Sequence, residues 1–310
     1  MATTTSITTT YAGQFAGKYI SAALLSGSTL DNGLITIKPN VKYKEVLKKV
    51  ATDANIIKDA TCDFTATGEV TLTERILQPE FFQVNLQLCK KDFQSDWEAI
   101  QMGYSAFDNL PPKFSDFIIG HAAGLVAEKT ENNIWAGQTG TAGEFDGFYY
   151  LATAGGSGCV SVSGTPLTAA NIIDEIGKVV DAIPSAVYGK EDLHIYLSRK
   201  AAKLYVRALG GFGANGLGAA GVNAQGTQWW NNGALSYDGV KVVMAAGLPD
   251  DSMMAAQKSN MYFGTGLMSD QNEVKLIDMA DVDGSQNVRL VMRFSAGVQM
   301  GITSDVVIYA

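Results

Sequence analysis

The stretch PKFSDFIIGHAAGLVAEKTENNIW, residues 112–135, contains the longest helical pattern of the chain. Its apolar side chains recur at the three- and four-residue spacing of one helix face, and a proline occupies the first turn, where its missing N–H group is not needed. At about 1.5 Å per residue, such a helix spans roughly 36 Å. The expected apolar face comprises Phe114, Phe117, Ile118, His121, Leu125 and Ile134, with Asp116, Glu128 and Glu131 off it. We predict that His121 is a core histidine.

The segment before this helix has the alternating pattern of extended strands. Asn55–Asp59 and Cys62–Thr67 are predicted strands with a turn at 67–69, and Val84–Cys89 is predicted as a further strand. A two-stranded ribbon is marginally stable alone in water, so a hairpin this polar needs another surface to lie on. Its candidate anchors to a neighbouring subunit are Ile56, Ile57 and Phe64.

The first residues of the chain form a second polar segment with isolated anchors. Six of the first ten residues are Thr, and Tyr11, Phe15 and Tyr19 then recur every four residues. A tail that stays free in water would leave these three aromatic side chains without a surface to pack against. We therefore predict an arm that becomes ordered against a neighbouring subunit.

The segment after the helix reads as an α/β unit. Residues 137–166 are rich in Gly, Ser and Thr and suggest a boundary. Helices are predicted at 168–183 and 199–209, with Ser198 capping the second, and strands at 193–197 and 240–245. Between them, residues 210–234 form a long Gly-rich loop that carries Trp229 and Trp230, which we predict to lie in an inter-subunit contact. The alternative is that both rings pack into their own subunit. Strands follow at 273–279, 287–300 and 304–309.

The composition indicates a protein that covers much of its surface with other proteins. Apolar residues make up 46% of the 310 residues and charged residues 17%, whereas soluble domains carry about a quarter charged residues. Interface cores are depleted in charged side chains. No apolar run approaches the ~18–20 residues of a membrane span, and the three cysteines are too few and too widely spaced to suggest a disulfide framework.

Basic side chains are concentrated near the N-terminus. The chain has a net charge of −8, yet residues 1–60 hold seven lysines against four carboxylates, so the remaining residues hold 16 basic and 27 acidic side chains. The cluster comprises Lys38, Lys42, Lys44, Lys48 and Lys49. These five residues are candidates to face nucleic acid or an acidic partner. A solvated strand face, or pairing with acidic residues of a neighbouring subunit, explains them as well.

No motif for catalysis, a cofactor or a metal is recognisable. Residues 211–216, GFGANG, match the dinucleotide fingerprint only by letters, because the motif must follow a strand and open a helix. Only two histidines are present, and the second, His194, lies within a predicted strand. We therefore predict neither enzymatic activity nor a cofactor.

Four stretches, taken in order, resemble a known family. They are KYISAALL at 18–25, LITIKPNVKYKEV at 34–46, AQKSNMYFGT at 256–265 and RLVMRFSAGVQMG at 289–301. Together with the order of the predicted elements, they resemble the major capsid protein of tailed bacteriophages, the Hong Kong 97 fold. The resemblance implies an α+β fold in which residues 1–50 form an N-terminal arm and its link to the core. It also implies an extended hairpin loop at 51–92, a peripheral domain from 93–144 and 266–310 with 112–135 as its spine helix, and an axial domain at 145–265.

The same resemblance implies a function and partners. The protein would assemble with itself into pentamers and hexamers of an icosahedral virion shell that encloses double-stranded DNA. A separate scaffolding protein, a portal and a cement protein would be further partners, with non-specific contact to the packaged DNA and none to a membrane. Two rival interpretations remain: an encapsulin-like bacterial compartment of the same fold, and an enzyme whose site is not recognised.

Overall fold

The computed structural model describes residues 28–52, 69–89, 112–210, 235–266, 274–280 and 284–310, together with Ile57, Asp59 and Cys62. The chain divides into two compact units. One unit comprises residues 1–26, 81–130 and 267–295, and the other comprises 27–80, 131–266 and 296–310. The helix α3 (Pro112–Ala136) and the strand β12 (Asn287–Met300) contribute residues to both units.

The second unit is built around a six-stranded mixed sheet, in the order β5-β13-β9-β6-β8-β7. Its strands are β5 (Val160–Val162), β6 (Leu193–Leu197), β7 (Leu235–Tyr237), β8 (Val240–Met244), β9 (Met253–Gln257) and β13 (Val307–Tyr309). The helices of this part are α4 (Phe148–Thr153), α5 (Ile172–Asp181) and α6 (Arg199–Gly210). We call this sheet, these helices and their connections the α/β body.

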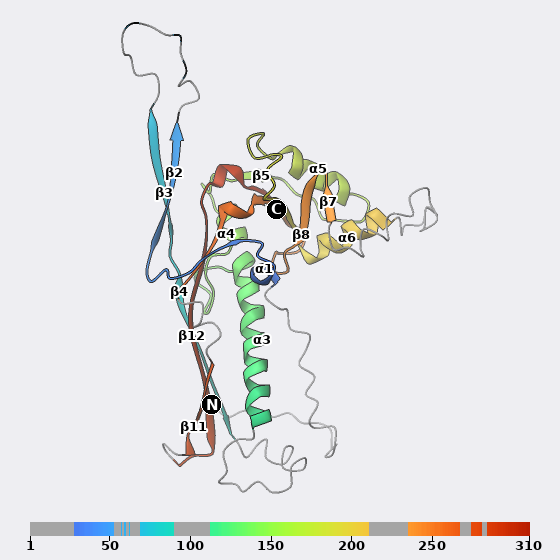
Figure 1. Cartoon of the computed structure of the whole chain (residues 1–310). Coiled ribbons are helices and arrows are strands. Elements are labelled where there is room, and N and C mark those ends of the chain that lie inside the picture. The colour runs from blue at the N-terminus through green and yellow to red at the C-terminus, as the bar shows by residue number, and fades with distance from the viewer. Residues whose placement is uncertain are drawn as a thin grey trace. The chain divides into compact units, whose positions relative to one another are not determined.

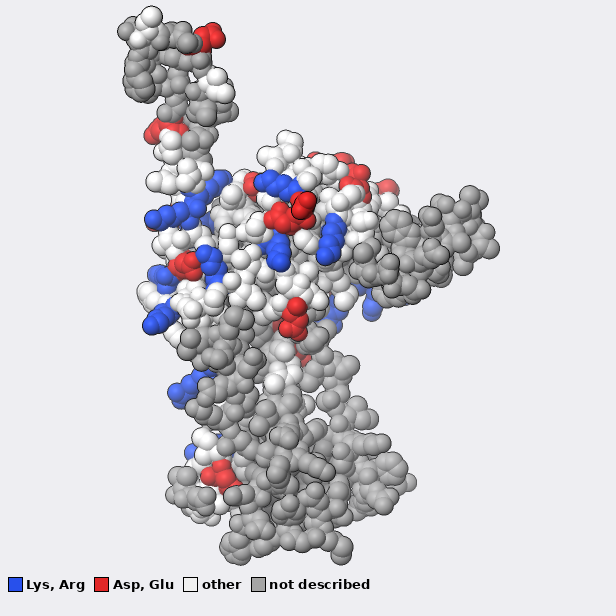
Figure 2. All heavy atoms as spheres, in the orientation of Figure 1, with Lys and Arg blue, Asp and Glu red and all other residues white. Residues whose placement is uncertain are grey.

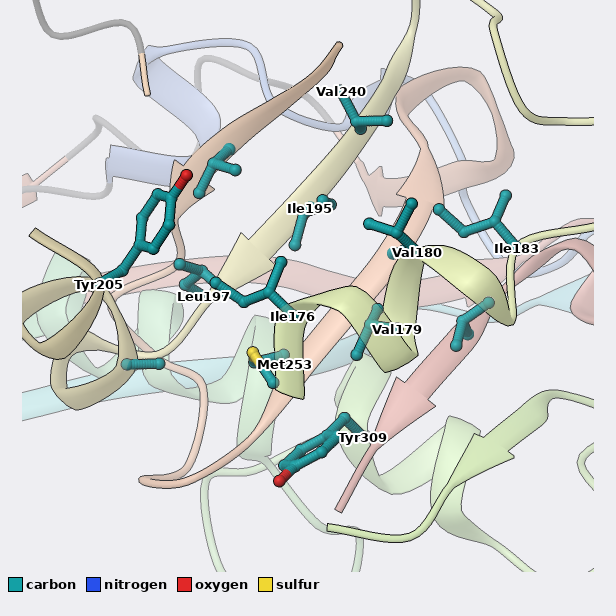
Figure 3. Close-up of a cluster of buried hydrophobic side chains, with 14 of the residues drawn as sticks. Ile176, Val179, Val180, Ile183, Ile195, Leu197, Tyr205, Val240, Met253 and Tyr309 are labelled. Atoms are coloured by element: carbon teal, nitrogen blue, oxygen red, sulfur yellow. The ribbon is translucent and has the colours of Figure 1, made fainter. Parts of the chain in front are cut away.

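The core of the α/β body lies between the sheet and its helices. Ile176 and Val179 of α5 point toward Ile195 of β6 and Met253 of β9, and all four are fully buried (Figure 3). β6 and β9 are buried at every position. That is the pattern of a central strand covered on both faces, which explains their continuous apolar sequences.

The same unit contains two further structures. The first is a ribbon of two antiparallel strands, β2 (Glu45–Thr52) and β3 (Val70–Leu77), which lie side by side over their whole length (Figure 1). The second is a set of paired strands: β1 (Thr36–Lys38) runs parallel to β10 (Met261–Thr265), which pairs antiparallel with residues 296–300 of β12. The short helices α1 (Ser28–Asp31), η1 (Lys258–Asn260) and η3 (Thr303–Asp305) complete it.

In the first unit, residues 288–292 of β12 pair antiparallel with β11 (Val274–Asp278), and β12 also pairs with β4 (Glu80–Cys89). The Phe82 and Phe294 rings contact each other with centroids 5.6 Å apart, and Arg289 donates to the Gln87 side chain on the opposite face at 3.2 Å. In the part of the chain that the structure describes, no helix is long and apolar enough to cross a membrane.

The elements after residue 112 confirm most of the sequence prediction. The long helix, β6 and β12 have their predicted bounds within one residue, and the Ser198 hydroxyl caps α6 by accepting from the Ala201 N–H group. Two predictions on α3 were wrong: His121 is exposed, and Glu131, expected off the apolar face, is fully buried. A tertiary partner described below accounts for the burial of Glu131.

The ribbon begins earlier than the sequence pattern suggested. Its first strand starts at Glu45, within the lysine-rich segment, and Val84–Cys89 belongs to β4, which pairs with β12 rather than within the ribbon. Of the two expected strands 55–59 and 62–67, only Ile57, Asp59 and Cys62 are among the described residues. Those expectations therefore stay predictions.

Candidate assembly surfaces

The ribbon has an apolar face that is exposed in the part of the chain that the structure describes. In the register of β2 and β3, Val46 lies opposite Ile76 and Val50 opposite Leu72, so these four side chains share one face, together with Val70. We call it the outer face. Leu72 is 70% exposed and Val50 62%, and the other three are between 43% and 62% exposed. Lys48 and Glu74, opposite each other, stand between the two apolar pairs.

An exposed row of five branched apolar residues is unusual for a part of the chain that is complete by itself. Monomeric proteins rarely leave contiguous apolar patches in water, and larger ones mark interaction sites. A two-stranded ribbon also has no second layer in which to bury such residues. The outer face is therefore a candidate interaction surface.

The opposite, inner face of the ribbon is attached at one end. Leu77 is fully buried, and a Cβ atom added at Gly264 would stand 3.0 Å from its side chain. Nearby, a Cβ atom at Gly297 would stand 2.8 Å from the carbonyl oxygen of Gln78. Both glycines therefore permit a close approach of the chain that leads out of β3.

The chain that follows the N-terminal segment is held in a buried polar pocket. The Glu131 carboxylate accepts from the Thr29 N–H group at 3.1 Å and also from the Thr29 hydroxyl. The indole N–H group of Trp135 donates to the same hydroxyl oxygen at 2.8 Å, and the Tyr196 hydroxyl donates to the Leu34 carbonyl at 2.8 Å. This pocket explains why Glu131 is buried, because its charge is matched by hydrogen-bond donors.

A second buried carboxylate fixes the last strand of the α/β body. Glu175 of α5 accepts from Lys178 at 2.9 Å, from the Tyr309 hydroxyl at 3.0 Å and from the Thr165 hydroxyl at 3.0 Å. The Lys178 ammonium, followed by the two hydroxyls, holds the pKa of Glu175 below its usual value in spite of burial. The carboxylate therefore stays ionised and ties β13 to α5.

The histidine of β6 is a structural residue. His194 is 8% exposed, and its Nδ1 atom lies 2.8 Å from the Asp192 carbonyl oxygen. Burial lowers the pKa of His194. The ring is not grouped with other potential ligands, and the described residues contain no cluster of three or more His, Cys, Asp or Glu side chains that could hold a metal ion.

The five candidate DNA-facing lysines do not form one patch. Lys38 pairs with Glu45 at 2.6 Å, and its Nζ atom lies 5.4 Å from the centre of the Tyr262 ring. Lys44 lies over Tyr43, and Lys42 is exposed. Lys48 and Lys49 are consecutive in β2, so they point to opposite faces of the ribbon. In the space-filling view, the blue side chains along the ribbon and below it lie among red and white ones and do not form one continuous area (Figure 2).

Most of the predicted subunit-interface residues lie outside the described part of the chain. These are Tyr11, Phe15, Tyr19, Ile56, Phe64, Trp229 and Trp230. Ile57 is described and is 90% exposed. Sequence reasoning missed the outer face of the ribbon, although the alternation of Val46, Lys48 and Val50 was a usable signal.

Comparison with known proteins relates the chain to solved structures only. No family model matches it, and no curated protein matches its sequence. The capsid of a native GTA particle is 10% identical to it, with a TM-score of 0.65, 98% of this chain covered and 94% of that chain. The capsid of Myoviridae phage XM1 is 13% identical, with a TM-score of 0.60 and 94% of each chain covered.

A structure from Mycobacterium phage Che8 is 14% identical to the chain, with a TM-score of 0.53, 94% of this chain covered and 91% of that chain. These likenesses extend over nearly the whole of each chain, so they concern the complete arrangement rather than one shared motif. The chain has the mixed α+β fold of phage major capsid proteins, as its sequence predicts.

Proposed function

We propose that the chain is the major capsid protein of a phage shell, and that its ribbon binds a second copy of the same chain. The exposed apolar outer face is the observation that carries this proposal, because a folded subunit in water gains nothing from it. The capsid structures that share the fold support a structural role, and they make an enzymatic one less fitting.

Charge complementarity favours a second copy as the partner of the ribbon. Residues 36–52 and 70–77 carry six basic side chains and two acidic ones, whereas the chain as a whole has a net charge of −8. The rest of the chain is therefore strongly acidic. Most of this positive charge lies in residues 36–44, which lead into the ribbon and hold three lysines, whereas the two ribbon strands hold three basic and two acidic side chains. The basic segment beside the ribbon and an acidic neighbour attract one another, and such attraction guides association and fixes orientation.

Within this proposal the parts of the chain take the roles implied by the family. The helix α3 would be the spine of the peripheral domain. The α/β body would be the axial domain, with the loop 210–234 and its two tryptophans near the centre of a pentamer or hexamer. The shell would enclose double-stranded DNA, with scaffolding, portal and cement proteins as separate partners.

Electron microscopy of the purified protein with a ribbon variant tests the proposal. Leu72→Asp puts a charge on the outer face and should abolish shells. Thr71→Asp is the matched control, because Thr71 is the neighbouring exposed residue on the other face of the ribbon. Shells formed equally well by both variants would show that the outer face is not an assembly surface. Nuclease-protected DNA in shells isolated from infected cells distinguishes a genome capsid from a protein-filled compartment.

A further inference from the structure

The ribbon meets the rest of its unit through an arginine on its inner face. Arg75 lies opposite Leu47 in the ribbon register and is half-buried. Its Nη1 atom donates to the Gln299 side-chain oxygen at 3.3 Å, and its Nη2 atom donates to the Ser157 carbonyl oxygen at 3.3 Å. One guanidinium thus joins the ribbon to the end of β12 and to the connection between α4 and β5.

Both acceptors of Arg75 are themselves held in place. The Gln299 side-chain oxygen also accepts from the Met300 N–H group at 3.0 Å, and the amide nitrogen of Gln299 donates to the Ile76 carbonyl at 3.0 Å. The Ser157 N–H group donates to the Ala154 carbonyl at 3.0 Å, and the Ser157 hydroxyl donates to Ala152 at 2.8 Å. The guanidinium therefore binds two fixed points, and its planar fork requires a defined orientation.

Two further attachments lie next to Arg75: the hydrogen bond from the Gln299 amide to the Ile76 carbonyl, and an apolar contact. Leu77 is buried against Gly264 two residues along β3. Packing of this kind holds the Leu77 side chain in place but does not fix the direction of the ribbon, because dispersion contacts are not directional. The two hydrogen bonds of Arg75 lie to one side of the Leu77 contact and reach two different elements. They therefore prevent the ribbon from rotating about that contact.

We propose that Arg75 is a positioning residue that sets the direction of the ribbon relative to the α/β body. Leu77 anchors the ribbon, and the hydrogen bonds of Arg75 to Gln299 and Ser157 orient it. The orientation is then present in the single subunit, before any partner binds. Its importance for assembly rests on the proposed function, but the orientation itself can be measured without assembly.

The experiment measures a distance distribution by electron paramagnetic resonance in the purified, unassembled full-length subunit. One spin label replaces Thr71, on the ribbon, and the other replaces Lys190, on the α/β body; both positions are exposed. The labels are attached to bio-orthogonal amino acids, so that the three native cysteines remain. A second pair, at the register partners Val50 and Leu72, reports whether the ribbon itself stays formed.

In Arg75→Met the Thr71–Lys190 distribution should broaden, while the Val50–Leu72 distribution stays narrow. Because a net hydrogen bond shifts an equilibrium by several-fold, the loss of two should raise the ratio of displaced to docked ribbons roughly 10- to 100-fold. Arg75→Lys should not restore the narrow distribution, because an ammonium lacks the two-pronged geometry. Lys49→Met is the matched control: it removes the same charge from the same face, two residue pairs further from Leu77, and should change neither distribution.

An unchanged Thr71–Lys190 distribution in Arg75→Met would overturn the proposal. Broadening of both distributions would also overturn it, because Arg75 would then stabilise the ribbon rather than orient it. If Arg75→Lys fully restored the narrow Thr71–Lys190 distribution, a positive charge alone would be sufficient. The two-pronged geometry of the guanidinium would then not be required. None of these outcomes depends on whether shells form, so this proposal and the proposed function fail separately.

Discussion

The α/β body and the ribbon use the same apolar residue types for opposite purposes. In the body, Ile176, Ile195 and their neighbours are fully buried in one subunit. In the ribbon, Val50 and Leu72 face one another across two strands and remain largely exposed. Burial is the main source of folding free energy. The body therefore carries the stability of the subunit, and the ribbon exposes apolar surface that, under the proposed function, would be buried between subunits.

The largest effect is expected in the core of the body. Ile195→Ala removes a fully buried side chain from the central strand β6, and such changes lower the free energy of unfolding by about 2–5 kcal/mol because a cavity remains. Urea unfolding followed by circular dichroism measures the loss. A loss below about 1 kcal/mol would show that the body is not the stable part of the subunit.

A smaller effect is expected where α1 is held by the buried polar pocket. Thr29→Val keeps the shape of the side chain but removes the hydroxyl that bonds to Glu131 and Trp135. The free energy of unfolding should fall by about 1–3 kcal/mol, because the buried Glu131 carboxylate and Trp135 indole N–H group each lose a hydrogen-bond partner. Trp135 fluorescence should change in the same variant. Thr141→Val, at an exposed loop residue, is the control and should leave both stability and fluorescence unchanged.

The loss of folding stability at acid pH, here called the acid limb, tests the contribution of Glu175, the second buried carboxylate. The pKa of Glu175 is lowered in the folded chain, so its contribution is present at neutral pH and is lost as pH falls below about 4.5 through the folded pKa. Glu175→Gln should lower stability at pH 7 by about 1–2 kcal/mol and flatten this limb. Glu191→Gln, at an exposed residue, should keep the limb. Equal pH profiles for the two variants would contradict the assignment.

The smallest effect on stability is expected in the ribbon. Leu72→Ala should change the free energy of unfolding of the isolated subunit by less than about 0.5 kcal/mol, because the side chain is mostly in water. The same variant should raise the protein concentration needed for shell formation. A stability loss as large as that of Ile195→Ala would mean that the outer face is covered within the subunit, and the contrast between the two regions would disappear.

Sequence reasoning succeeded where a pattern is local and periodic. The long helix, β6 and β12 each show their period over enough residues to be recognised. It failed at Glu131, because a carboxylate on a helix is ordinarily solvated, and the partner that buries it lies 102 residues away at Thr29. The start of the ribbon was missed because the hairpin was predicted to begin at residue 51, and the lysine-rich segment before it was assigned to the link between arm and core.

The Arg75 contacts could not be predicted from sequence either. An arginine in a polar strand has no local signal that distinguishes a solvated side chain from one that joins three elements. Its partners, Ser157 and Gln299, are 82 and 224 residues away in the chain. Only the folded arrangement brings them together. Such long-range hydrogen bonds define the direction of the ribbon, and the local sequence pattern of a strand carries no information about that direction.

The position of β13 inside the sheet has a consequence for synthesis. Val307 pairs with Val160 and also with Ala255, so the last strand of the body lies between two strands made much earlier. On the ribosome, β2 and β3 emerge long before this gap can be filled, and the sheet remains split until residues 307–309 have been translated. Pairings so distant in sequence also form slowly. The apolar residues of β2 and β3 therefore leave the ribosome before the sheet of the body, and the attachment points of the ribbon at Ser157, Gly264 and Gln299, can be complete.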